Sequence, residues 1–136
     1  MKLTPFLTLN LAFFSVSIFA NTIVSSCPSL DTIENVNFTY SASNSSGGWI
    51  GIAKQGNSGD ITSFREALVY DLQPLKLQKC TYNLENGLVD MYLDENRDKE
   101  ISILNYQDSW SKLGGGWFDL FECRGKAEDC QFEFED

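Results

Sequence analysis

Apolar and polar residues alternate in short runs along most of this chain, and turn-forming residues separate the runs. A period of two is typical of β-strands that bury one face. The alternation predicts strands at residues 36–42, 49–53, 75–82, 88–93, 101–104 and 131–135. We expect the strand at 88–93 to pair with the one at 101–104 across a tip at 94–99. About eight strands at roughly ten-residue spacing predict an all-β fold, a small antiparallel sandwich or barrel.

Residues 64–72 fit two patterns. Ser63 and Glu66 have the spacing of a helix capping box, and the apolar positions that follow fit a helical face. The segment Leu68-Val69-Tyr70 is instead rich in strand formers. We predict a strand here, and a helix is the alternative.

The first twenty residues have the pattern of a secretory signal. Lys2 gives a positive start, an apolar run covers 7–20, and Ala20 is a small residue suited to cleavage. We therefore expect a signal peptide at 1–20 and one exported β domain at 21–136. We expect the mature protein to be secreted or periplasmic, and the short signal is typical of bacterial proteins. A rival interpretation is that residues 24–27 form a weak lipobox, which would place a lipid on Cys27.

The four cysteines are an even set, which in an exported chain indicates two disulfides with three possible connectivities. We favour Cys27–Cys80, which would join the mature N-terminus to the middle of the chain, and Cys123–Cys130, which would close a local hairpin. No Cys-x-x-Cys pair is present, which disfavours a redox or zinc-ribbon site.

Charge and composition exclude several functions. Removing residues 1–20 from the 136-residue chain leaves 116 residues, with 19 acidic and 9 of the 10 basic side chains because Lys2 is lost, a net charge of −10. This balance argues against nucleic acid and anionic membranes, and it suits a basic protein partner or cations. The absence of histidine excludes Ser-His-Asp and Cys-His catalysis. A carboxylate-pair hydrolase remains, with candidate pairs Glu66/Asp71, Asp90/Asp94, Asp119/Glu122 and Glu133/Glu135.

The densest charged stretch, residues 94–100, partly matches a calcium loop. Asp94, Asn96 and Asp98 occupy its first, third and fifth positions. Lys99 stands where the loop needs glycine, and Asn105 stands where it needs a bidentate glutamate. We therefore expect no tight calcium site, no other metal and no cofactor. Asp94 and Asp98 remain candidates for contacts with a basic partner.

The three tryptophans are the candidate binding anchors. Trp49 and Trp117 each follow two glycines, and together with Trp110 they could line a platform for a sugar or a peptide. The alternative is that glycine turns deliver these tryptophans into core strands. Exposure decides between the two interpretations.

Several short motifs occur in a characteristic order along the chain. They are Cys27-Pro28-Ser29, Gly48-Trp49, Phe64-Arg65-Glu66-Ala67, Cys80-Thr81-Tyr82 and the closing Cys123…Cys130-Gln131-Phe132. In this order the chain resembles an uncharacterised family of small exported bacterial proteins, a domain of unknown function. The resemblance implies an exported domain with paired cysteines and a strand at 64–72, and it supplies no catalytic residues.

Three functions follow from these observations. The first is a non-enzymatic exported binding protein of unknown ligand. A narrower form of it is an inhibitor or immunity-type protein that blocks a basic secreted enzyme. The third is a small carboxylate-based glycan hydrolase. An exposed loop or an acidic ridge would favour the inhibitor, and an apolar cleft with two facing carboxylates would favour the hydrolase.

Overall fold

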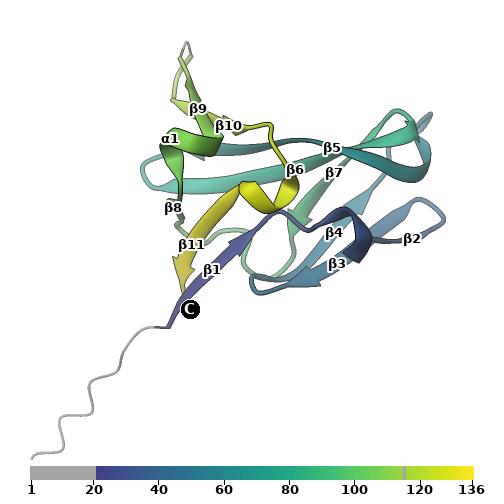
Figure 1. Ribbon diagram of the computed structural model, residues 1–136, viewed down its shortest axis with the longest axis horizontal. Coiled ribbons are helices and arrows are strands. Elements are labelled where there is room, and N and C mark those ends of the chain that lie inside the picture. The colour runs from purple at the N-terminus through teal and green to yellow at the C-terminus, as the bar shows by residue number, and fades with distance from the viewer. Residues whose placement is uncertain (1–20, 115) are drawn as a thin grey trace, which may run out of the picture.

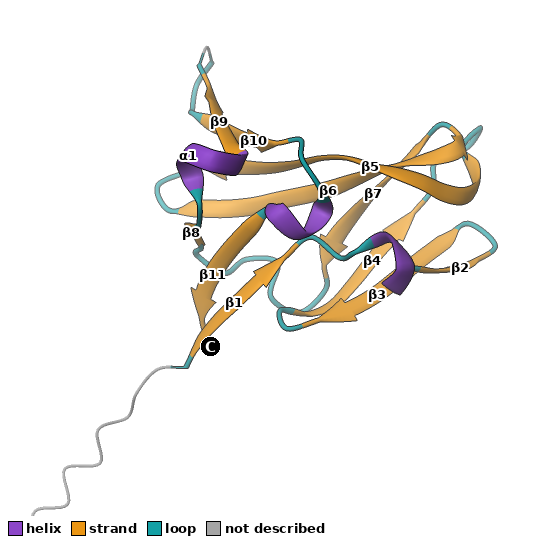
Figure 2. Ribbon diagram, viewed as in Figure 1, coloured by secondary structure: helices purple, strands orange, loops and turns teal. Residues whose placement is uncertain are grey.

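The structure is a computed structural model that describes residues 21–114 and 116–136, and most of these residues lie in β-strands (Figures 1 and 2). The strands are β1 Thr22–Ser26, β2 Glu34–Val36, β3 Thr39–Asn44, β4 Gly47–Ile52, β5 Ser58–Asp71, β6 Leu75–Asn86, β7 Leu88–Leu93, β8 Ser102–Ile103, β9 Trp110–Leu113, β10 Leu120–Cys123 and β11 Gln131–Glu135. The short helices are η1 Leu30–Thr32, α1 Tyr106–Ser109 and η2 Ala127–Asp129. The predicted signal segment lies outside the described residues.

The strands form two antiparallel sheets. The larger has eight strands in the order β2-β3-β4-β7-β6-β5-β10-β9, and the smaller has three in the order β1-β11-β8. Figure 2 shows the small sheet lying across the larger one. The predicted all-β antiparallel class is therefore confirmed, and the arrangement is the two-sheet alternative.

One row of inward-facing positions crosses the larger sheet from β3 to the edge strand β9. Residues directly opposite each other in adjacent strands share a face, so the register places them side by side. The row is built from Tyr40, Gly51, Met91, Cys80, Ala67, Cys123 and Trp110. Every member is buried. Gly51 is required in this row because a Cβ there would lie 2.4 Å from the carbonyl oxygen of Asp90.

The small sheet closes the other side of this core. Strand β11 alternates strictly, so Phe132 and Phe134 face inward and are almost fully buried. The Phe132 ring meets the edge of Trp49 on the larger sheet at a centroid distance of 6.4 Å. Burial of such aromatic side chains is the main stabilising contribution in a small domain.

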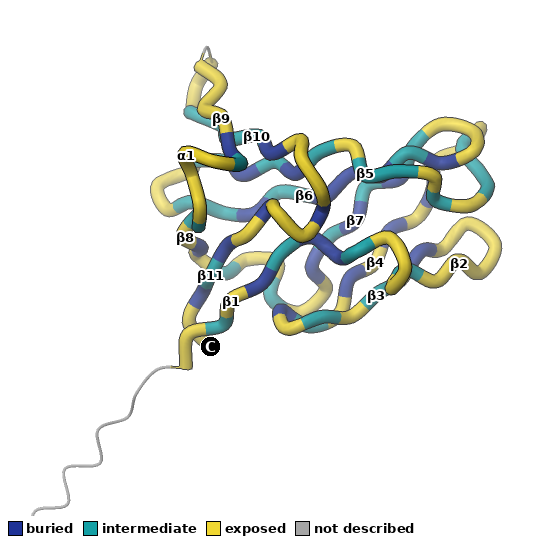
Figure 3. The backbone as a smooth tube through the Cα atoms, in the orientation of Figure 1, coloured by how far each residue is buried: buried dark blue, intermediate teal, exposed yellow. Residues whose placement is uncertain are grey.

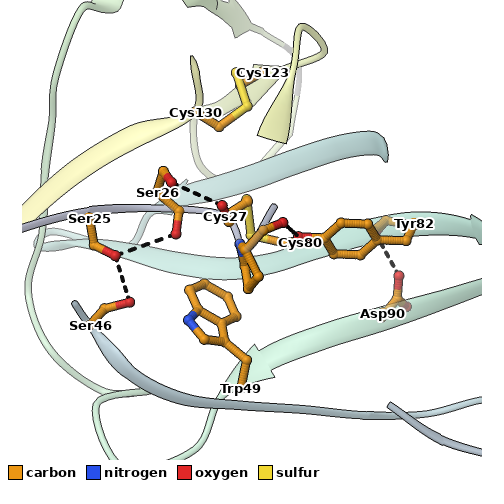
Figure 4. Close-up of a disulfide and its surroundings, with 12 residues drawn as sticks. Ser25, Ser26, Cys27, Ser46, Trp49, Cys80, Tyr82, Asp90, Cys123 and Cys130 are labelled. Carbon is orange, nitrogen blue, oxygen red and sulfur yellow. Dashed lines mark hydrogen bonds between the residues drawn. A yellow bond between two sulfur atoms is a disulfide. The ribbon is translucent and has the colours of Figure 1, made fainter. Parts of the chain in front are cut away.

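Both predicted disulfides are confirmed, and Figure 4 shows them close together in the core. Cys27 and Cys130 belong to segments next to the small sheet, whereas Cys80 and Cys123 lie in the large one. Each bridge therefore joins the two sheets. The expectation that Cys123–Cys130 closes a hairpin is wrong, because β10 and β11 belong to different sheets. The lipidation alternative also fails, since the sulfur of Cys27 is bonded to Cys80.

Residues 64–72 were open to two interpretations, and the strand is confirmed. They fall mainly within the long strand β5, which pairs with β6 on one side and β10 on the other. Four register shifts interrupt the β5–β6 ladder. Such bulges bend and twist a strand pair.

Two predicted strand arrangements are wrong. Residues 36–42 form a hairpin rather than one strand, because Asn37 adopts a left-handed conformation (φ 59°) and reverses the chain between β2 and β3. Strand β8 pairs with β11 and not with β7, so residues 94–99 connect the two sheets and are not a hairpin tip. At 36–42 the alternation also misled about burial, since Val36 and Phe38 are exposed, whereas at 101–104 only the strand partner was wrong.

Candidate functional site

The hairpin of β9 and β10 forms one edge of the large sheet, and its end extends beyond the neighbouring strands at one end of the molecule (Figure 1). Leu113 pairs with Leu120, and the ladder runs from there down to Trp110 and Cys123. On its other side β10 pairs with β5, and the backbone N–H of Asp71 donates to the carbonyl of Asp119 at 2.9 Å. The base of the hairpin is therefore held on two sides.

The tip carries a set of exposed apolar side chains. Trp117 has a relative exposure of 102%, so its whole indole faces solvent. Leu113, Phe118 and the adjacent Leu72 are exposed as well. Figure 3 shows the end of this hairpin as an exposed region. Large apolar residues gathered on a protrusion are typical of contact sites.

Packing beneath the tip limits its movement. The ring of Phe118 lies 4.9 Å from that of Tyr70 on β5, tilted by 43°. Lys112 Nζ and Asp119 Oδ2 form an ion pair at 3.2 Å across the hairpin, with both side chains about half exposed. A groove of about 500 Å³ runs beside Trp117, between it and the turn that contains Leu72 and Gln73. The aromatic pair thus gives the tip a defined base on β5.

The other two tryptophans are not available as binding anchors. Trp49 is 1% exposed, and its Nε1 donates to Oδ1 of Asn44 at 2.9 Å. Trp110 is also buried, and its Nε1 has no hydrogen-bond partner within the described part of the chain. For these two positions the core interpretation is correct, and only Trp117 retains the predicted accessibility.

Asp94 and Asp98 lie exposed on the connection between β7 and β8. Asn96 between them donates from Nδ2 to the carbonyl of Ser46 at 2.9 Å, so its amide supports the β3–β4 turn. The guanidinium of Arg97 lies 4.4 Å from the ring centroid of Tyr92. In residues 21–114 and 116–136 no group of three or more His, Cys, Asp or Glu side chains is arranged to hold a metal ion. The absence of a tight calcium site stays a prediction.

A carboxylate pair that the sequence did not indicate lies on the outer face of the large sheet. Glu66 on β5 and Glu122 on β10 lie close enough for Arg124 to form ion pairs with both. Burial raises the pKa of Glu66, and the neighbouring Glu122 carboxylate raises it further, against the lowering effect of Arg124 and Arg65. Neither glutamate lines the groove beside Trp117.

This pair was missed because its members are far apart in sequence. We proposed Glu66 with Asp71, and Glu122 with Asp119, which are close in sequence. The register of β10 on β5, with Cys123 opposite Ala67, is what brings Glu122 near Glu66. No local spacing could have signalled it, because the pairing of non-consecutive strands is a tertiary property.

The family comparison confirms the resemblance to a domain of unknown function. The family described as "Protein of unknown function (DUF3757)" matches residues 22–133, and the chain belongs to this family. No curated protein and no solved structure matches it. In the described residues no helix is long and apolar enough to cross a membrane.

Proposed function

We propose that the protein is an exported, non-enzymatic binding protein of the inhibitor type, which inserts the Trp117 hairpin into a concave site on a basic secreted protein. The full exposure of Trp117 on a projecting hairpin carries the proposal. Tryptophan is among the residues most enriched at binding hot spots, and its truncation there commonly costs about 2 kcal/mol or more of binding energy. The exposed loop is the feature that separates the inhibitor from a hydrolase.

Export is part of the proposal and rests on the signal pattern at 1–20. The two disulfides support it, because such bonds persist mainly in oxidising compartments. The packing of Phe118 against Tyr70 supports the binding role, because a pre-positioned loop loses less entropy on association. The charge of −10 on residues 21–136 would accelerate encounter with a basic partner.

A capture experiment tests the role of the hairpin. Mature protein, its Trp117→Ala variant and a Val24→Ala control are immobilised and exposed to native culture medium. Val24 is an exposed apolar residue on β1 and lies outside the hairpin. We expect wild type and Val24→Ala to retain a basic enzyme whose activity they lower, and Trp117→Ala to lose it. Equal capture by all three proteins would contradict the hairpin as the contact.

Association kinetics with the captured enzyme test the role of charge. Replacing Asp94, Glu95, Asp98 and Glu100 with their amides should slow association without unfolding the domain. Salt should have the same effect above about 0.15 M, where the Debye length is near 8 Å. Salt-independent association would remove the electrostatic steering and leave the hairpin contact in place.

The hydrolase alternative has its own test. The pair of Glu66 and Glu122 favours it, but neither residue lines the groove beside Trp117 or the groove between η1 and η2. Turnover of peptidoglycan that the substitution Glu66→Gln abolishes would overturn the non-enzymatic proposal.

A further inference from the structure

A second groove lies between the two loops that the disulfides tether, away from the Trp117 hairpin. One wall is η1 with Leu30 and Asp31, and the floor is Ser63 and Phe64 of β5. The other wall is the segment 125–128 that leads into η2. The groove has a volume of about 520 Å³, within the range of sites that hold small ligands or single side chains.

The interior of this groove is mainly apolar. Leu30 is exposed at its edge and Ala127 is buried in its wall. The ring of Phe64 packs edge-on against Tyr82 at a centroid distance of 5.3 Å. Tyr82 is fully buried and donates its hydroxyl hydrogen bond to the carbonyl of Pro28 at 2.5 Å. The floor is therefore anchored in the core and also tied to the first loop.

Both walls are held by covalent bonds. The first loop starts at Cys27, which is bonded to Cys80, and the second is closed by Cys123–Cys130. Within the first loop, the Thr32 hydroxyl donates to the carbonyl of Ser29 at 2.7 Å. A site with such constrained walls needs little ordering when a ligand enters, which favours binding.

The charges at the rim are mostly negative and stand on opposite walls. Asp31 belongs to η1 and Glu128 to η2, and both are exposed. Glu128 lines the groove from the wall opposite Asp31. Of the described residues that line the groove, Lys126 is the one cation.

We infer that this groove binds a basic peptide segment in which an apolar side chain is followed by an arginine or lysine. The apolar side chain would pack on Phe64 and Leu30, and the cation would lie between Asp31 and Glu128. Charge complementarity selects this occupant, because an anionic peptide would meet two carboxylates on the rim. The inference does not depend on the Trp117 hairpin.

Short peptides provide the probes. The test peptide is acetyl-Leu-Arg-Leu-amide, with acetyl-Leu-Glu-Leu-amide as the charge control and acetyl-Gly-Arg-Gly-amide as the apolar control. Titrations into ¹⁵N-labelled mature protein are followed by amide chemical shifts. We expect saturable shifts at Leu30, Phe64 and Gly125 with the arginine peptide, and an affinity about tenfold weaker for either control.

Variants make the result specific to the groove. Asp31→Asn combined with Glu128→Gln should weaken the arginine peptide at least about fivefold, and Leu30→Ser should weaken it as well. Trp117→Ala should leave this affinity unchanged, so that failure of the hairpin proposal and failure of this one are distinguishable. The spectra themselves show whether each variant is folded. Equal affinity for the Arg and Glu peptides, or shifts confined to other surfaces, would overturn the inference.

Discussion

Trp49 and Trp117 both follow two glycines in the sequence, yet they end in opposite environments. Trp49 lies on β4, which has a neighbour on each side, and Phe132 of the small sheet covers its indole. Trp117 lies beyond the end of β9, the edge strand of the large sheet, where its indole is fully exposed. Both sites share the sequence Gly-Gly-Trp, but only Trp49 is covered by the second sheet.

This difference shows how the molecule divides its aromatic residues between stability and contact. The buried N–H of the Trp49 indole has a hydrogen-bond partner inside the protein, because Asn44 Oδ1 accepts from it. Around Trp117 only the base of the loop is packed, through Phe118 and Tyr70. The core region should therefore respond strongly to substitution in unfolding experiments, and the hairpin should respond only in binding experiments.

The most direct way to break the comparison is to truncate each tryptophan. Trp49→Ala removes a buried indole and should lower the free energy of unfolding by about 3–5 kcal/mol. Trp117→Ala should change it by less than about 0.5 kcal/mol, because the side chain is solvated. Urea denaturation followed by circular dichroism measures both. Similar losses for the two variants would mean that the hairpin packs on the domain.

The disulfides test whether the core depends on joining the two sheets. In the chain-entropy model, removing Cys27–Cys80 with paired alanines costs about 4 kcal/mol and removing Cys123–Cys130 costs about 2.5 kcal/mol. We expect this order because the bridges span sequence separations of 53 and 7 residues. Denaturation of the two double variants measures the difference. The reverse order would indicate that native-state packing, and not loop length, dominates.

Asn44 tests the polar support of the buried indole. Its Oδ1 accepts from Trp49 Nε1 at 2.9 Å and from Ser46 Oγ at 2.6 Å. Asn44→Ala leaves a buried N–H without its partner and should lower stability by about 1–3 kcal/mol. Ser43→Ala, at an exposed position of the same strand, is the matched control and should change stability by less than about 0.5 kcal/mol. Equal stability losses for Asn44→Ala and Ser43→Ala would show that a water molecule replaces Asn44 as the hydrogen-bond acceptor of the indole N–H.

The smallest expected effect concerns pH at the base of the hairpin. Because the folded protein raises the pKa of Glu66, it binds that proton more tightly than the unfolded chain does. The protonated Glu66 carboxyl makes its full contribution to the free energy of unfolding below the pKa of the unfolded state. That contribution is lost as pH rises through the pKa of the folded state. Glu66→Gln should therefore gain stability relative to wild type as pH rises above about 4, the ordinary pKa of a glutamate in an unfolded chain.

Denaturation curves at several pH values check this sign. The groups that face Glu66 are Glu122, Arg124 and Arg65, and all three remain in the variant. If Glu66→Gln instead loses stability relative to wild type as pH rises, the ion pair of Glu66 with Arg124 outweighs the effects of burial and of the Glu122 charge.

The sequence by itself determined the class of fold and the covalent framework. Strict alternation at 131–135 identifies a half-buried strand, and β11 has that pattern of burial. The even cysteine count indicated two disulfides, and the favoured pairing is the one in the structure, although the hairpin expected for Cys123–Cys130 is not formed. These predictions succeed because the alternation of side chains along a strand and the pairing of thiols are local or combinatorial properties.

Only the tertiary structure decided which strands pair and which tryptophan stays exposed. The pairing of β8 with β11 and the meeting of Glu66 with Glu122 both join segments that are distant along the chain. Burial of Trp49 requires a second sheet above β4, and no local pattern encodes that sheet's position. Alternation shows that a strand has two faces, but packing between sheets decides which face is covered, and so which residues remain free to bind.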